Sequence, residues 1–119
     1  MPVRNEGAFM SRSLKAVLAQ DYPQDRMEIL VIDGMSTDST RATIAAFQAD
    51  DQRIKLLDNP GRIVPTGLNA ALRVATGEII VRVDGHCEIA PDYVCRCVDH
   101  LQHESVDAVG GPLETVGET

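Results

Sequence analysis

The sequence predicts an α/β fold, with a mainly parallel sheet flanked by helices. Helical and strand signals alternate along the 119 residues, which is typical of this class. The clearest strand candidate, residues 28–33, is a short continuous apolar run of the kind found in strands that are buried on both faces. No repeat, low-complexity tract or linker divides the chain, so we treat residues 1–119 as one unit.

In the first half of the chain we expect two helices and one strand. The first helix is expected over residues 8–20, where apolar side chains recur at helical spacing. It should end at Asp21-Tyr22-Pro23, because the residue before a proline avoids the helical conformation. A strand is predicted over residues 28–33. A helix from about residue 36 to 49 follows, since its start is rich in Ser, Thr and Asp, which cap helices.

The second half continues the alternation. A second strand is predicted over residues 54–57, and a third over residues 78–84. Between them lies a helix closed by Gly77, and Pro91 suits the first position of a further helix. We expect a fourth strand to begin at 106–109. The apolar stripe of the first of these helices is Leu68, Ala71, Leu72 and Ala75, and that of the second is Val94, Cys97, Val98 and Leu101.

Composition excludes several classes of partner. The net charge is -7, and aromatic residues make up 3% of the chain with no Trp, which argues against binding to nucleic acid. No apolar run reaches the roughly 20 residues that span a bilayer, and the first residues do not resemble a signal peptide. Three cysteines, an odd number, fit a reducing compartment. We therefore expect a cytoplasmic setting.

Two strands end in an aspartate followed by a glycine, at the edge of a parallel sheet where ligands collect. Asp33 could accept hydrogen bonds from a ribose or a base, and we favour a functional role because it has no evident capping duty. Asp38 is instead expected to cap the following helix. Asp84 and His86 could present an oxygen and a nitrogen to one divalent ion. A turn aspartate beside a surface histidine is the alternative.

Other candidates are weaker when taken singly. Arg4 could meet a phosphate and Glu6 a sugar or base, yet both equally suit a turn that leads into a helix. Arg62 could face a nucleotide, although solvated loop arginines are commoner. Three cysteines and three histidines crowd residues 86–103, but no C-x-x-C pair exists, and Cys95 and Cys97 face different directions on a helix. A structural zinc site is therefore disfavoured.

Taken together, PVRNEG, VIDGMSTDST, NPGRIVPTGLNAAL and VRVDGH resemble the nucleotide-binding half of a family 2 glycosyltransferase of the GT-A type. The resemblance covers essentially the whole chain and implies a Rossmann-like sheet. It also implies binding of a nucleotide-diphosphate sugar and transfer of the sugar, with inversion, to a glycan or lipid-linked acceptor.

The resemblance also assigns roles to residues. Asp33 would lie toward the base, and Asp84 would be the first acid of the metal-binding D-x-D signature, with His86 in place of the second acid. Asp84 and His86 are thus expected to hold Mn²⁺ or Mg²⁺. The D-G-H form is similar to a branch that builds bacterial exopolysaccharides such as succinoglycan. The residues expected at the nucleotide are Pro2, Arg4, Glu6, Asp33, Arg62 and Asp84.

Two expected parts of the family pattern are missing from residues 1–119. Family members precede the P-V-x-N-E turn with an apolar strand, and they place the catalytic base and acceptor site in a carboxyl-terminal half. We therefore expect a partial domain, truncated at both ends, whose sheet is completed by another segment or by self-association. No catalytic base can be named, and little transferase activity is expected in isolation.

The alternative to a glycosyltransferase fragment is a non-catalytic nucleotide-binding or degenerate module. A dinucleotide-binding protein is disfavoured, because G-x-G-x-x-G is absent. A longer form is expected at the inner face of the membrane.

Overall fold

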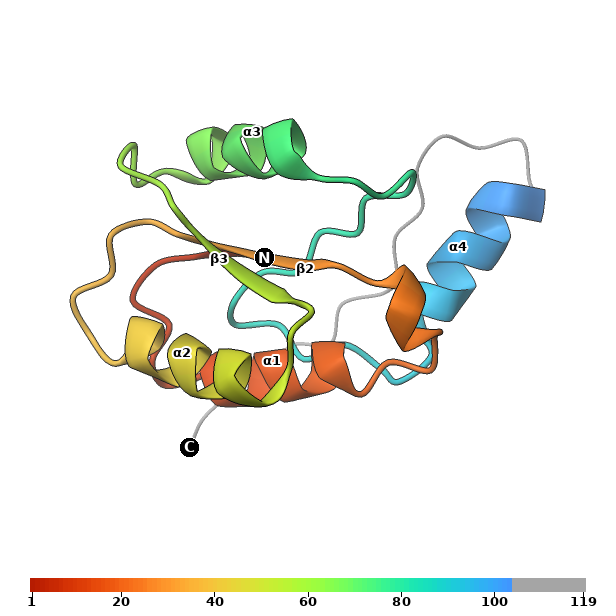
Figure 1. Ribbon diagram of the computed structural model, residues 1–119, viewed down its shortest axis with the longest axis horizontal. Coiled ribbons are helices and arrows are strands. Elements are labelled where there is room, and N and C mark those ends of the chain that lie inside the picture. The colour runs from red at the N-terminus through yellow and green to blue at the C-terminus, as the bar shows by residue number, and fades with distance from the viewer. Residues whose placement is uncertain (104–119) are drawn as a thin grey trace.

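Three parallel strands form the sheet, in the order β1-β2-β3 (Figure 1). The computed structural model describes residues 1–103, and its strands are β1 (Pro2–Val3), β2 (Ile29–Asp33) and β3 (Ile54–Asp58). Val3 pairs with Asp33, and Asp33 pairs with Asp58, so the strands end side by side at one edge. The predicted parallel sheet is confirmed, and β2 and β3 match their predicted ranges to within one residue. The strand expected at 106–109 lies outside the described residues.

Helices cover both faces of this sheet. The helices α1 (Met10–Leu18) and α2 (Thr40–Asp50) lie on one face, and α3 (Val64–Val74) lies on the other (Figure 1). A 3₁₀ turn, η1 (Gln24–Arg26), leads from α1 to β2, and α4 (Tyr93–His103) lies at one end of the molecule. The hydrophobic core lies between α1, α2 and the sheet, and α1 contributes its predicted apolar stripe to it. Its buried residues are Val3, Met10, Leu14, Val17, Ile29, Val31, Ile44, Ile54 and Val83.

Three helices begin at positions other than those predicted. The start of α2 is Thr40 rather than residue 36, because the preceding polar residues hold a loop instead of a helical turn. α1 begins at Met10 rather than residue 8. α3, for which no start was predicted, begins at Val64 with a proline in its first turn, where the missing N–H costs nothing. α4 begins at Tyr93, two residues after Pro91.

The short strand β1 consists of the first two residues of the P-V-x-N-E motif. Met1 and Val3 accept hydrogen bonds from Ile32 and Gly34 of the β2 segment, at 2.9 and 2.8 Å. The structure assigns no strand to residues 78–84, so that prediction is wrong. The backbone N–H and carbonyl groups of successive residues in a strand point to opposite edges. Met1 and Val3 bond to β2, so the backbone of Pro2 faces the outer edge of β1, and Pro2 has no N–H to donate to a further strand.

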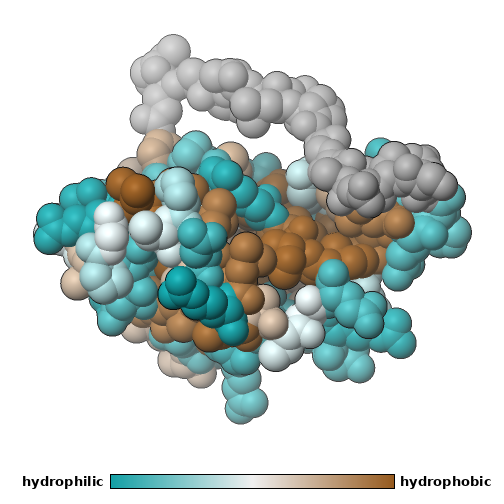
Figure 2. All heavy atoms as spheres, turned by 90° about the horizontal axis from the view of Figure 1, so that it is seen from above, coloured by the Kyte–Doolittle hydropathy of each residue, from teal (hydrophilic) through white to brown (hydrophobic). Residues whose placement is uncertain are grey.

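The apolar stripe of α3 lines an open hollow rather than a packed core. The hollow holds about 530 Å³ and lies between α3, β2, the segment 77–83 and α4. Leu72 and Ile80 are each 56% exposed beside it. Figure 2 shows apolar residues gathered along the middle of this face of the molecule. Within residues 1–103, no helix has the length and apolar character needed to cross a membrane.

Candidate functional site

Three loops leave the carboxyl ends of the three strands at the same edge of the sheet. One residue in each loop has a left-handed backbone: Asn5 with φ 50°, Met35 with φ 63° and Arg62 with φ 66°. No other non-glycine residue in the described range 1–103 has a positive φ. Such a conformation costs about 1–2 kcal/mol for an L-residue, and it persists only where surrounding contacts enforce it. Strain of this kind clusters at ligand sites, which favours this edge as the functional one.

The loops after β1 and β2 are bonded to each other. The backbone N–H of Asn5 donates to Ser36 Oγ at 2.8 Å, and that of Glu6 donates to Thr40 Oγ1 at 2.8 Å. The Asn5 side chain in turn accepts a bond from the N–H of Thr37 at 2.9 Å. These bonds fix the backbone of Asn5 and Glu6 against the start of α2.

Asp38 joins the same two loops. Its Oδ1 accepts the N–H of Thr40 at 2.9 Å, and its Oδ2 accepts the N–H of Gly7 at 3.0 Å. The N-cap of α2 is Ser39 rather than Asp38, and no side chain makes a capping bond there. The hydroxyl of Thr40, followed by the backbone N–H of Thr40, lowers the pKa of Asp38. This carboxylate therefore has a structural function at the entrance of the site.

Asp33 is fully buried and has several partners. Its carboxylate accepts bonds from the N–H and the hydroxyl of Ser36, and Nη1 of Arg41 lies 2.8 Å from Asp33 Oδ2. The same Arg41 nitrogen lies 2.8 Å from Asp58 Oδ1, at the end of β3. These hydrogen bonds, first to Asp33 and then to Asp58, raise the pKa of Arg41. Burial of the Asp33 charge requires these donors, so this carboxylate has structural partners that its lack of a capping duty did not predict.

A pocket of about 150 Å³ opens at the strand ends. Every residue that the sequence assigns to the site lines it, except Asp33, which lies beneath the loops. Ligand pockets of drug size hold roughly 300–1,000 Å³, so this pocket can enclose one part of a larger ligand. Its lining residues are Pro2, Val3, Arg4, Glu6, Ile32, Asn59, Arg62, Ile63, Val64, Asp84 and His86.

A tight turn carries Asp84 and His86 into this pocket. The N–H of Cys87 donates to the carbonyl of Asp84 at 3.0 Å, which closes the turn. The hydroxyl of Ser13, on α1, donates to the carbonyl of Gly85 at 2.7 Å in a buried bond. A Cβ on Gly85 would lie 2.7 Å from Cγ1 of Val3, so only glycine fits this approach to β1. The turn is thus clamped between β1 and α1.

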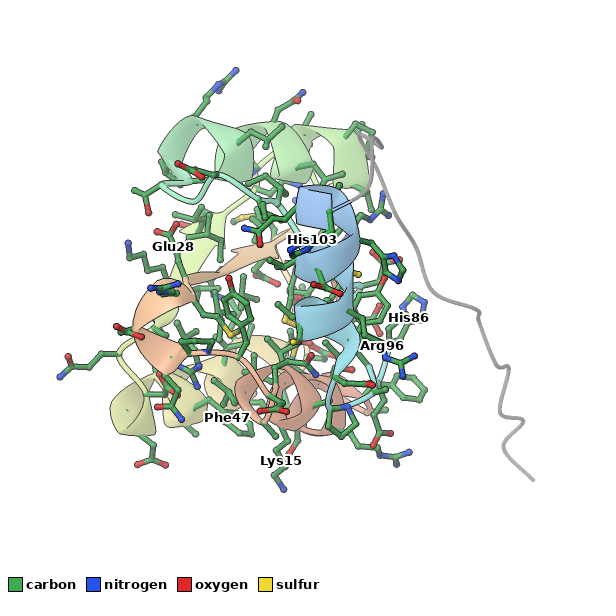
Figure 3. The ribbon with its side chains drawn as sticks, turned by 90° about the vertical axis from the view of Figure 1, so that its right-hand side faces the viewer. Lys15, Glu28, Phe47, His86, Arg96 and His103 are labelled. Carbon is green, nitrogen blue, oxygen red and sulfur yellow. The ribbon has the colours of Figure 1, made fainter. Side chains whose placement is uncertain are left out.

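The ligand atoms of this turn converge. Asp84, His86 and Cys87 each offer one such atom, and the three atoms lie within 4.8 Å of one another. Nδ1 of His86 lies 3.3 Å from Oε1 of Glu6, and the His86 side chain is 58% exposed at the surface of the molecule (Figure 3). Nε of Arg82 lies 3.0 Å from Oδ1 of Asp84. The carboxylate and imidazole fit Mn²⁺, and the carboxylate also fits Mg²⁺.

The sequence reasoning missed residues that reach this site from distant positions. Arg41 and Ser13 carry no local signal, because their partners are fixed only by the packing of α2 and α1 on the sheet. Cys87 was considered only as part of a disfavoured structural zinc site, although its position directly after D-G-H was the available signal.

Solved structures define the class of fold. The mannosyltransferase PcManGT from Pyrobaculum calidifontis, in complex with GDP-Man and Mn²⁺, matches with a TM-score of 0.81 and 32% identity over 88% of this chain and 32% of its own. S. aureus TarS 1-349 in complex with UDP matches with a TM-score of 0.72 and 22% identity, over 94% of this chain and 36% of its own. The protein has the fold of the GT-A glycosyltransferases.

Sequence comparison gives the family. The glycosyl transferase family 2 model matches residues 1–118, and the chain belongs to this family. Glycosyltransferase AglE of Haloferax volcanii is 30% identical over 96% of this chain and 38% of its own. The succinoglycan biosynthesis protein ExoA of Rhizobium meliloti is 29% identical over 98% and 36%. The expected family resemblance is confirmed, and the chain spans little more than a third of the length of these curated relatives.

Proposed function

We propose that this chain binds the nucleotide-diphosphate part of a sugar donor, through Mn²⁺ or Mg²⁺ held by Asp84 and His86. It would serve as the donor-binding part of an inverting glycosyltransferase whose acceptor is a glycan or a lipid-linked saccharide. The observation that carries the proposal is the pocket at the strand ends, which brings Arg4, Glu6 and Arg62 together with the two metal-ligand candidates.

The charges around the pocket suit a diphosphate. Arg4 and Arg62 approach it from the loops after β1 and β3, and guanidinium groups bind phosphate oxygens through paired N–H donors. A divalent ion on the carboxylate of Asp84 would neutralise further phosphate charge. The complex of PcManGT with GDP-Man and Mn²⁺, at 32% identity, supports this combination of nucleotide and ion.

The reaction that this site would support is a single displacement. A bond forms between the acceptor oxygen and the anomeric carbon, the bond to the diphosphate oxygen breaks, and the acceptor proton passes to a base. The ion, when bound, stabilises the charge on the departing diphosphate. Asp84 and His86 hold it, Glu6 orients His86, and the arginines position the phosphates. We assign no base, and we propose that the 119-residue chain alone binds donor but transfers little sugar.

Two further proposals follow from the sequence. The sheet is completed by another segment or by a second copy, and the protein acts on the cytoplasmic side of the membrane. Sedimentation of the purified chain tests the first of these, because self-association would give a dimer at micromolar concentration.

Calorimetric titration with GDP or UDP tests the donor site. Saturable heat is expected with Mn²⁺ and not with EDTA, and Asp84→Asn should weaken binding at least about tenfold, because charge-assisted contacts to the ion are lost. Asp50→Asn, an exposed carboxylate at the end of α2, is the matched control and should bind as the wild type does. Metal-independent binding that survives Asp84→Asn would overturn the site. The absence of heat with either nucleotide would favour a degenerate module.

A further inference from the structure

The turn that carries Asp84 and His86 holds a third ligand, which a diphosphate site for Mg²⁺ does not need. The Sγ of Cys87 lies in the same cluster as the carboxylate and the imidazole, all within 4.8 Å. Cys87 is half-buried and packs against the core that includes Val3. Its sulfur therefore faces both the apolar interior and the metal-ligand cluster.

An oxygen, a nitrogen and a sulfur ligand make a different site from two oxygens. Mg²⁺ takes oxygen ligands in octahedral geometry, whereas thiolate and imidazole are typical ligands of Zn²⁺. Three protein ligands leave one position of a tetrahedral Zn²⁺ site open, which is the pattern of catalytic rather than structural zinc. Within residues 1–103, Asp84, His86 and Cys87 are the set of at least three His, Cys, Asp or Glu side chains whose ligand atoms lie close enough to hold one metal ion.

The surroundings hold these ligands in place before any ion binds. The clamp formed by Ser13 and Val3 on Gly85 fixes the backbone of the turn. Oε1 of Glu6 lies 3.3 Å from Nδ1 of His86, so Nε2 is the ring nitrogen without this contact. A carboxylate on the second ring nitrogen is the usual partner of a metal-binding histidine, since it sets the tautomer and the orientation of the ring.

We propose that Cys87 is a metal ligand and that Asp84, His86 and Cys87 form a site that prefers Zn²⁺ to Mg²⁺. The fourth position is open to water or to a phosphate oxygen. Only the role of that fourth position rests on the proposed function. Binding of the ion itself requires no nucleotide, so the two can be tested separately.

Cobalt titration of the full chain, without nucleotide and with the cysteines kept reduced, tests the proposal. Co²⁺ takes the same ligands as Zn²⁺, and a thiolate bound to it absorbs in the near ultraviolet. We expect this band at one equivalent of Co²⁺, its loss on addition of Zn²⁺, and its persistence in about a hundredfold excess of Mg²⁺, following the softness of the ligands.

Cysteine variants identify the sulfur. Cys87→Ser should remove the band and weaken Co²⁺ binding at least about tenfold, whereas Cys95→Ser, an exposed cysteine of α4, should keep both. His86→Gln is the second variant and should weaken binding while the band remains at saturating Co²⁺. A band that persists in Cys87→Ser, or displacement by equimolar Mg²⁺, would overturn the proposal. A cobalt band without nucleotide binding would support it and would instead contradict the proposed donor site.

Discussion

The hydroxyl of Ser13 donates a buried hydrogen bond of 2.7 Å to the carbonyl of Gly85, and so joins the first helix to the turn that carries the candidate metal ligands. Ser13→Ala should lower the free energy of unfolding by about 1–3 kcal/mol, because it leaves a buried carbonyl without a donor. It should also weaken Mn²⁺ binding, since the turn loses its contact with α1. Urea unfolding and metal titration measure the two effects.

Ser11→Ala is the matched control, because Ser11 lies on the same helix but is only half-buried. Its effect should stay within about 0.5 kcal/mol. Equal effects of the two variants would mean that the bond to Gly85 does not hold the turn.

Gly85 and Gly77 form a second matched pair. A Cβ at Gly85 would lie 2.7 Å from Val3 and 3.0 Å from Glu6, whereas a Cβ at Gly77 meets nothing nearer than 3.5 Å. Gly85→Ala should therefore cost about 1–3 kcal/mol of stability through overpacking, and Gly77→Ala should be neutral or slightly stabilising. Thermal unfolding of both variants checks this, and an unchanged melting temperature for Gly85→Ala would contradict the close approach of the turn to β1.

Arg82 competes with an ion for Asp84. Its Nε lies 3.0 Å from Oδ1 of Asp84, in a pair whose side chains are 52% and 34% exposed. Exposed pairs of this kind contribute about 0.2–1 kcal/mol, so Arg82→Gln should raise the affinity for Mn²⁺ by up to about fivefold. Arg96→Gln removes a comparable exposed pair between α4 and Asp92, the residue before that helix, and should leave the affinity unchanged. Weaker metal binding by Arg82→Gln would instead indicate that Arg82 positions Asp84.

Arg41 stabilises a buried charge. Arg41→Gln leaves Asp33 with Ser36 as its remaining partner, and should lower the free energy of unfolding by about 1–3 kcal/mol, less than for a fully buried pair because Arg41 is 41% exposed. Arg73→Gln, at an exposed position of α3, is the control. Asp33→Asn added to Arg41→Gln should recover part of the loss, because the uncompensated charge is removed. Additive losses in a double-mutant cycle would contradict this coupling.

The positions of β2 and β3 could be predicted from the local sequence pattern, but the lack of a strand at residues 78–84 could not. Ile29–Asp33 opens with a continuous apolar run and Ile54–Asp58 is a shorter apolar segment interrupted by Lys55, and each forms a strand close to the predicted bounds. Residues 78–84 are also rich in Ile and Val, yet they form no strand. The strand β1 is only two residues long, and its Pro2 has no N–H to donate, so it offers little edge for pairing. Propensity along one segment does not reveal what its neighbour can donate.

The site shows the same division. The spacing predicted that Asp84 and His86 lie together, and they do, but a tight turn rather than an extended segment brings them there. Asp33 could be located at a strand end, but its partner Arg41 depends on how α2 packs beside β2. The late start of α2 has a related cause. The N–H of Ser36 bonds to the carboxylate of Asp33, and the carboxylate of Asp38 accepts the N–H of Gly7, so these polar residues stabilise the loops rather than an earlier helical turn.

The clamp on the turn also has a kinetic consequence. The contacts of Ser13 with Gly85 and of Glu6 with His86 join residues that are 72 and 80 positions apart. Contacts across such long loops form late in folding, so the ligand cluster arises only with the completed fold. An ion at a hundred times its dissociation constant then adds about 2.7 kcal/mol to the stability of the native state alone. Metal supply and survival of the chain against proteolysis thus become linked.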